Sequence, residues 1–210
     1  MTVCWNIYED QTKWASGIAA CLVDAVPDGG TLIITGGSSP APIYQQMAEA
    51  ALPWGQITLL LSDDRMVPAT HDQSNLRLAK SHFGTTGATI PALTEDAARA
   101  AMPAKAGLLG MGPDGHILSW FAGADGYDTA LTTDRMVCTI DAKNSPIAQP
   151  ITDRITLTHA TVALCPQWHV AIKGDDKRAI AMAAQTDPDL YPVGALLRMD
   201  ALTTTIHWCP

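Results

Sequence analysis

Three short polar segments of the sequence carry side chains that could act on a small anionic molecule. The first is the run Gly36, Gly37, Ser38 and Ser39. Glycines let a backbone turn and approach a ligand closely, while serine hydroxyls and free backbone N–H groups donate hydrogen bonds. The run is a candidate phosphate-binding loop, although a plain tight turn with a serine cap has the same composition. It has neither P-loop spacing nor the GxGxxG order of a dinucleotide-binding turn, so ATP and NAD have no motif support.

The second segment is Asp63, Asp64 and Arg65. A guanidinium can bind phosphate through two parallel hydrogen bonds, and a nearby carboxylate can orient a histidine or polarise a hydroxyl. A solvated charged turn is the competing interpretation of such a segment.

The third segment runs over residues 110–116 and ends in Asp114, a glycine and His116. Histidine titrates closest to neutral pH, which is what a general base requires. A lone histidine is more often structural, but the accompanying glycine turn and Asp114 single this one out. Asp63 and Asp114 are the two candidates to hold the imidazole of His116 in one tautomer.

Each polar segment follows a short apolar run, at residues 31–35, 57–61 and 106–110. Continuous apolar runs of this length indicate strands buried on both faces, as in a parallel sheet. Ligands of such sheets bind beyond the carboxyl ends of the strands. We therefore expect the three segments to converge at one edge of the sheet.

The rest of the pattern extends this arrangement. Apolar spacing predicts helices at residues 11–26, 74–83 and 175–184, and another that carries Ile43, Tyr44, Met47 and Ala51 on one face. Further strands are predicted at 136–140 and 168–172, with a closing edge strand at 203–208; residues 154–158 could be strand or loop, and 141–150 must be a loop. The alternation predicts an α/β fold: one domain over residues 1–210, with a doubly wound, mostly parallel sheet and right-handed crossovers.

Composition narrows the possible partners. The chain has 210 residues, 47% of them hydrophobic, and a formal net charge of −8. No global positive field exists to hold nucleic acid or an anionic membrane, so an anionic ligand must be bound by a local cluster. The N-terminal segment lacks a leader pattern and no apolar run approaches 18 residues, so we expect a cytoplasmic protein. The five scattered cysteines and six histidines show no metal-ligand spacing, which predicts reduced thiols and no metal.

Six motifs follow one another along the chain: residues 35–40 (TGGSSP), 62–68 (SDDRMVP) with Ser74 and Asn75 after them, 108–116 (LLGMGPDGH), 119–123 (SWFAG), 154–158 (RITLT) and 174–177 (GDDK). In this order they resemble the 6-phosphogluconolactonase family, which lies within the larger sugar-phosphate isomerase and glucosamine-6-phosphate deaminase fold. The resemblance covers most of the chain.

The resemblance implies hydrolysis of 6-phospho-D-glucono-1,5-lactone to 6-phosphogluconate, a step of the oxidative pentose phosphate pathway, without metal or organic cofactor. It implies that His116 is the general base, that the loop from Gly36 to Ser39 and Arg65 bind phosphate, and that Lys177 and Arg154 are further basic site residues. The implied partner is a small phosphorylated sugar lactone, with no nucleic acid or membrane, and the protein would be a monomer or a small homo-oligomer.

The sequence departs from the family pattern at two places, and two alternative functions stay open. Asp64 stands where the family usually has Glu, and residues 117–122 (ILSWFA) differ from the family pattern, which concerns the lid and the substrate range. An isomerase or deaminase of the same fold would share the acidic loop and His116, but its pattern resembles Asp-Glu-Tyr where this chain has Arg65. A non-catalytic sugar-phosphate sensor would usually carry a DNA-binding domain, for which 210 residues leave no room.

Overall fold

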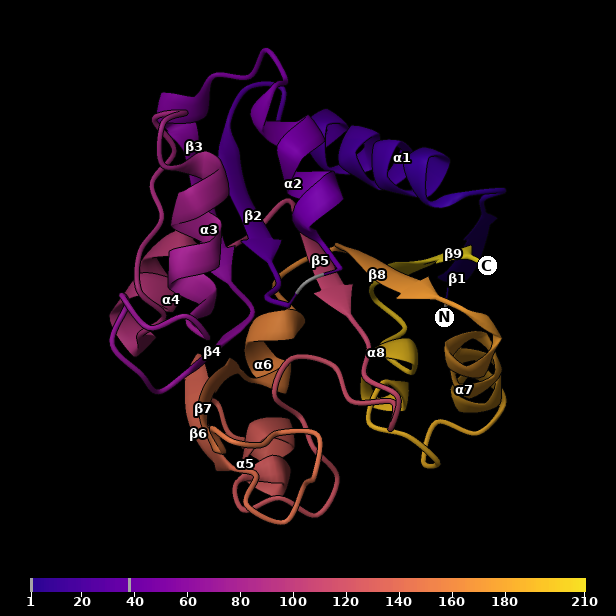
Figure 1. The fold of residues 1–210 in the computed structure, drawn as a ribbon. Coiled ribbons are helices and arrows are strands. Elements are labelled where there is room, and N and C mark those ends of the chain that lie inside the picture. Colours follow the sequence, from indigo (N-terminus) through magenta and orange to yellow (C-terminus); the bar gives the residue numbers. More distant parts are fainter. Residues whose placement is uncertain (1, 38) are drawn as a thin grey trace.

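The computed structural model describes residues 2–37 and 39–210, and a six-stranded parallel sheet forms the centre of this part of the chain. The strands pair in the order β1, β9, β8, β5, β2, β3 (Figure 1). Their bounds are β1 (Thr2–Ile7), β2 (Gly30–Ile34), β3 (Ile57–Leu61), β5 (Ala106–Gly110), β8 (Gln167–Lys173) and β9 (Thr203–Cys209). The predicted fold class, α/β with a mostly parallel sheet, is confirmed.

Helices connect and flank these strands, as parallel pairing requires (Figure 1). They are α1 (Gln11–Asp24), α2 (Ala41–Ala48), α3 (Asn75–Phe83), α4 (Glu95–Ala101), α5 (Tyr127–Thr132), α6 (His159–Val162), α7 (Asp175–Thr186) and α8 (Gly194–Leu197), with a 3-10 turn at Trp54–Gln56. The predicted helices α1, α2, α3 and α7 are confirmed with small shifts at their ends. Within the described residues, no helix combines the length and apolar character that crossing a bilayer requires.

The order of the strands reverses between β2 and β5. The chain goes from β2 to its outer neighbour β3, but from β5 it continues toward β8 and then β9. The chain thus proceeds from β2 toward one edge of the sheet and from β5 toward the other edge. At such a reversal a crevice opens between the carboxyl ends of the two strands, here β2 and β5. The loops that follow these two strands are the glycine-serine run and the segment that ends in His116.

A second, antiparallel sheet corrects two sequence predictions and decides a third that was left open. It has the order β4 (Asp63–Arg65), β7 (Asp153–Leu157), β6 (Val137–Asp141). The strand predicted at 136–140 exists, but it pairs with β7 here instead of joining the parallel sheet, and residues 63–65 form a strand instead of a charged turn. Residues 154–158, left open between strand and loop, are largely strand. Hydrophobic periodicity identifies a strand but does not say which sheet it joins.

The two ends of the chain give another correction. The strand predicted to close the sheet, β9, lies inside it, between β8 and β1. The edge strand is β1, whose residues are mostly exposed and therefore show no apolar run. Its parallel pairing with β9 brings the first and last strands of the chain side by side.

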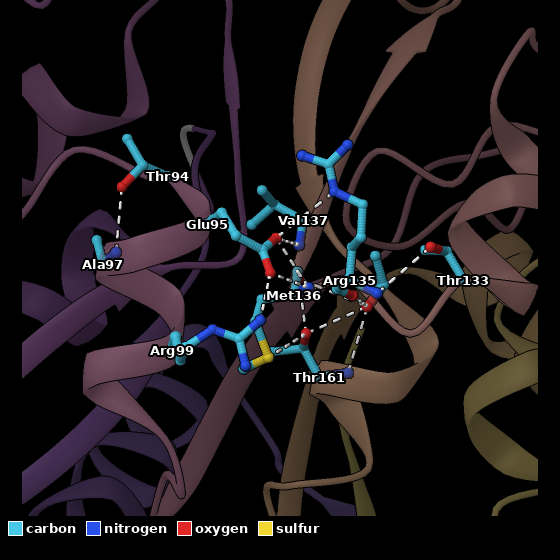
Figure 2. Close-up of polar contacts among 10 residues, drawn as sticks. Thr94, Glu95, Ala97, Arg99, Thr133, Arg135, Met136, Val137 and Thr161 are labelled. Atoms are coloured by element: carbon cyan, nitrogen blue, oxygen red, sulfur yellow. Dashed lines mark hydrogen bonds and ion pairs between the residues drawn. The ribbon is translucent and has the colours of Figure 1, made fainter.

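Glu95 connects helix α4 to strand β6 of the second sheet. Thr94 caps the N-terminus of α4 by accepting a hydrogen bond from Ala97 N, which places Glu95 in the first turn (Figure 2). The Glu95 carboxylate accepts hydrogen bonds from the backbone N–H groups of Met136, at 3.0 and 3.1 Å, and Val137, at 3.2 Å. Arg99 also donates to it, at 2.8 Å. The start of β6 is therefore fixed to α4 by one carboxylate.

Candidate active site

The three polar segments converge, as predicted, on one cleft at the carboxyl ends of the parallel strands. The cleft has a volume of about 280 Å³. The predicted site residues that line it are Gly36, Gly37, Ser39, Asp63, Arg65, His116, Arg154 and Lys177. Asp114 is not among the residues that line the cleft but contacts His116, and Ser38 lies outside the described residues.

His116 and Asp114 form a hydrogen-bonded pair at the end of β5. The Nδ1 atom of His116 lies 2.5 Å from Oδ1 of Asp114, and the backbone N–H of His116 also donates to this oxygen, at 3.3 Å. Burial raises the pKa of the Asp114 carboxyl, but the hydrogen bonds and charge of His116 outweigh it and leave this pKa below the ordinary value. Asp114 thus engages Nδ1 and leaves Nε2 as the nitrogen that can exchange a proton with a molecule in the cleft.

Two glycines make this short-range pairing possible. Gly115 has a φ of +77°, a left-handed conformation that turns the chain between Asp114 and His116. A Cβ atom on Gly112 would overlap Nδ1 and Cε1 of the His116 ring. The glycine turn is visible in the sequence, but nothing in the sequence identifies Gly112 as the residue that makes room for the imidazole.

Asp63 is held by two serines. Its carboxylate is buried and accepts hydrogen bonds from the hydroxyls of Ser62 and Ser119, each at 2.7 Å. Of the two acids considered as partners of His116, the structure pairs the histidine with Asp114. Asp63 still lines the cleft and contributes a fixed negative charge beside the cationic residues.

Arg65 is oriented by Asn75, a residue that stands out in the sequence only as part of a motif. The Nη1 group of Arg65 donates to Oδ1 of Asn75. The Asn75 amide group in turn donates to the backbone carbonyl of Asp63, at 2.7 Å, and its backbone N–H donates to Asp64, at 2.6 Å. A Cβ atom on Gly36 would overlap the Asn75 side chain, so the missing side chain of Gly36 leaves the space that the Asn75 amide occupies. Asn75 carries no charge, and only its position after Ser74 in the motif could have pointed to it.

Asp64 has a structural position at the start of α3. Its carboxylate accepts hydrogen bonds from the backbone N–H groups of Arg65, Asn75 and Leu76 and from the Ser74 hydroxyl. Burial raises the pKa of Asp64 above its ordinary value, although these backbone hydrogen bonds oppose the rise. The shorter Asp in place of the family's usual Glu therefore caps a helix and does not reach into the cleft.

Three cationic side chains meet at the cleft of this acidic protein. Arg65 and Arg154 are register partners on β4 and β7, so they leave adjacent backbones. Arg154 is buried; its guanidinium donates to the carbonyls of Ala148, at 2.9 Å, and Ile151, at 3.0 Å. Lys177, in the first turn of α7, donates to the Met111 carbonyl at 2.5 Å, and burial lowers its pKa. This is the local cationic cluster that an anionic ligand needs.

Comparisons with known proteins agree on one family. Residues 11–208 match the family model described as glucosamine-6-phosphate isomerases/6-phosphogluconolactonase. A 6-phosphogluconolactonase of Caulobacter vibrioides is 33% identical over 92% of this chain and 90% of its own, and one of Rhizobium meliloti is 30% identical over the whole of both chains. The crystal structure of a 6-phosphogluconolactonase from Shewanella baltica superposes with a TM-score of 0.88 at 23% identity, over 99% of this chain and 98% of that one.

Proposed function

Because the chain belongs to the family of glucosamine-6-phosphate isomerases and 6-phosphogluconolactonases, we propose that it hydrolyses 6-phospho-D-glucono-1,5-lactone to 6-phospho-D-gluconate. The observation that carries this proposal is the cleft in which the His116–Asp114 pair faces a cluster of cations. Enzymatic hydrolysis of a phosphorylated δ-lactone needs an activated water, a group that stabilises the developing oxyanion and residues that bind and position the phosphate. The cleft offers candidates for each of these three requirements.

The phosphate binds among Arg65, Lys177 and the loop from Gly36 to Ser39. Arg65 is pre-oriented by Asn75, so less side-chain freedom is lost when the guanidinium meets a phosphate. Lys177 must exchange its hydrogen bond with the Met111 carbonyl, or share it, to reach an anion. Arg154 adds positive charge from the neighbouring strand, while its guanidinium donates hydrogen bonds to two backbone carbonyls.

His116 acts as the general base. Its neutral imidazole accepts a proton from water at Nε2 while Asp114 holds Nδ1, and the resulting hydroxide attacks the lactone carbonyl carbon. A cationic side chain or a backbone N–H stabilises the oxyanion. When the tetrahedral intermediate collapses, the imidazolium returns its proton to the departing ring oxygen. The base is thereby restored, and the product is the open-chain acid, which releases its carboxyl proton to solvent and leaves as the carboxylate.

The test compares two lactones in the same assay. Glucose-6-phosphate dehydrogenase generates the phosphorylated lactone, and its disappearance is followed with and without the protein, because such lactones also open spontaneously. We expect kcat/KM for the phosphorylated lactone to exceed that for unphosphorylated gluconolactone by about 100-fold or more, since two charge-assisted hydrogen bonds are lost without the phosphate. Equal values for the two lactones would contradict the proposal. Turnover of glucosamine 6-phosphate instead would assign the chain to the deaminase side of the family.

The proposal extends to the setting of the enzyme. We propose that it acts in the cytoplasm as a single domain over residues 1–210, as a monomer or a small homo-oligomer. Its role is the lactone-opening step of the oxidative pentose phosphate pathway. The net charge of −8 argues against nucleic acid or an anionic membrane as a partner.

A further inference from the structure

A second cluster of chemically active side chains lies in the core beneath α1. His169 on β8 and His207 on β9 are 6% and 0% exposed, and Cys21 of α1 lies half-buried beside them. One ligand atom of each residue lies within 4.8 Å of the other two. None of the three lines the cleft or has a part in the proposed reaction.

The hydrogen bonds of this cluster leave one buried nitrogen without a partner. The Tyr8 hydroxyl lies 2.8 Å from Nδ1 of His207, and Nε2 of His207 lies 3.0 Å from Nδ1 of His169. Nε2 of His169 is buried and has no hydrogen-bond partner among the described residues. Since buried polar atoms are almost always satisfied, a chain of contacts that ends in an open ring nitrogen calls for a further ligand.

A helical glycine accommodates the hydroxyl that orients His207. Gly17 lies in the interior of α1, where glycine weakens a helix relative to alanine. A Cβ atom there would lie 2.5 Å from Cε1 and 2.7 Å from the hydroxyl of Tyr8. Metal-binding histidines generally donate their second ring N–H to an oxygen, which fixes the tautomer and the ring orientation. Tyr8 can accept that hydrogen bond from Nδ1 of His207, which leaves Nε2 with a lone pair.

We propose that Cys21, His169 and His207 bind one divalent transition-metal ion, Zn²⁺ being the best match. One thiolate and two imidazoles are ligands that favour zinc over Mg²⁺ or Ca²⁺. The bond lengths of a tetrahedral zinc site place two nitrogens about 3.3 Å apart and a sulfur about 3.5 Å from each nitrogen. The ligand atoms of the three residues already lie within 4.8 Å of one another, so the site closes when side chains rotate and Cys21 approaches.

The ion would have a structural role. It would tie α1 to β8 and β9, with the Cys21 proton released to solvent when the thiolate binds. Cys21 is the partly exposed member of the three, so it marks the side from which an ion and a fourth, water ligand would enter. Sequence spacing could not reveal this set, because its members come from three separate elements.

Cobalt titration provides the test, because Co²⁺ substitutes for zinc and reports its ligands by absorption. The metal-free, reduced full-length protein should bind one equivalent of Co²⁺ with a thiolate-to-cobalt charge-transfer band, and Zn²⁺ should displace it. Cys21→Ser should abolish the band and weaken Zn²⁺ binding by about 100-fold or more. Tyr8→Phe should weaken it by about 10-fold, the scale of losing a hydrogen bond to a metal-binding histidine.

The control is Cys4→Ser, which removes an exposed cysteine from the edge strand and should keep the band. Cys21→Ser is a conservative change at a half-buried position, and its far-ultraviolet circular dichroism should match that of the unchanged protein. Its lactonase activity should equal that of the unchanged protein, because Cys21 lies outside the cleft. The proposal is overturned if the unchanged protein gives no charge-transfer band, or if the band survives Cys21→Ser or is lost in Cys4→Ser.

Discussion

Replacing Asp114 with Asn should move the acidic limb of the kcat/KM profile to lower pH. The carboxylate lies 2.5 Å from Nδ1 of His116, and the hydrogen bonds and charge of His116 hold the pKa of the Asp114 carboxyl below its ordinary value, a coupling that is reciprocal. Without that charge the imidazolium loses its proton more readily, so the base becomes available at a lower pH. The sign of the expected shift is therefore downward.

The size of this shift follows from the geometry. Two unit charges about 4 Å apart interact by about 4 kcal/mol at an effective dielectric constant of 20. The side chains of Asp114 and His116 are 34% and 18% exposed, so solvent screening lowers that value. Hydrogen bonds to charged groups contribute about 1.5–3 kcal/mol. At 1.36 kcal/mol per unit, we expect a shift of about 1–2 pH units.

The plateau of kcat should fall as well. An Asn side chain can donate its amide N–H to Nδ1 of His116, which places the ring proton on Nε2 and blocks that nitrogen as a base. We expect a loss of about 10²-fold, the lower end of what a general base supplies. Asp96→Asn, which removes an exposed charge from α4, is the control for the change in net charge.

The assay follows acid release with a pH indicator at several pH values, with the spontaneous opening of the lactone subtracted. The reasoning about the pair is refuted if Asp114→Asn leaves the limb where it is or moves it upward. A shift of the same size in Asp96→Asn would attribute the effect to overall charge and not to the hydrogen bond.

Four further outcomes are expected. His116→Asn should lower kcat by about 10²- to 10⁴-fold while calorimetric binding of 6-phosphogluconate is retained; near-normal turnover would place the base elsewhere. Arg65→Ala should raise KM for the phosphorylated lactone by about 10- to 100-fold without affecting the unphosphorylated one, so an equal effect on both substrates would contradict its phosphate role. Gly112→Ala should lower kcat because its Cβ overlaps the His116 ring, whereas Gly55→Ala, whose Cβ meets nothing within 4 Å, should not. EDTA should leave activity intact, because no three His, Cys, Asp or Glu side chains at the described part of the cleft lie within ligand distance of one another; activity that needs one added metal would show a missed catalytic site.

The parallel sheet and the position of its cleft could be predicted because burial on both faces leaves a clear sequence pattern. Residues 57–61 and 106–110 carry no charged side chain and are mostly apolar and buried, and the structure has strands with those same bounds. Once these runs are taken as parallel strands, the polar segments after them must share one edge. The convergence of Arg65 and His116 on one cleft follows from that topology.

The features that escaped prediction depend on long-range pairing or on the absence of a side chain. Strand β4 is three charged residues, and its strand conformation comes from pairing with β7, about ninety residues later along the chain. The contribution of Gly112 is the space that it leaves for His116, which no spacing rule detects. Asn75 acts through hydrogen bonds to groups brought together only by the fold, and so its importance for Arg65 has no local signature.

The pairing of Arg65 with Arg154 has a thermodynamic consequence for the second sheet. Like charges on directly opposed residues of neighbouring strands repel one another, so the free protein holds β4 against β7 at some cost in stability. A phosphate dianion bound at Arg65, as proposed above, would offset that repulsion because it would bring negative charge to the two guanidiniums. Ligand occupancy and the cohesion of the small sheet are therefore linked, and the link is reciprocal. Any change that loosens β4 from β7 must weaken the hold on phosphate by the same free energy with which phosphate tightens the sheet.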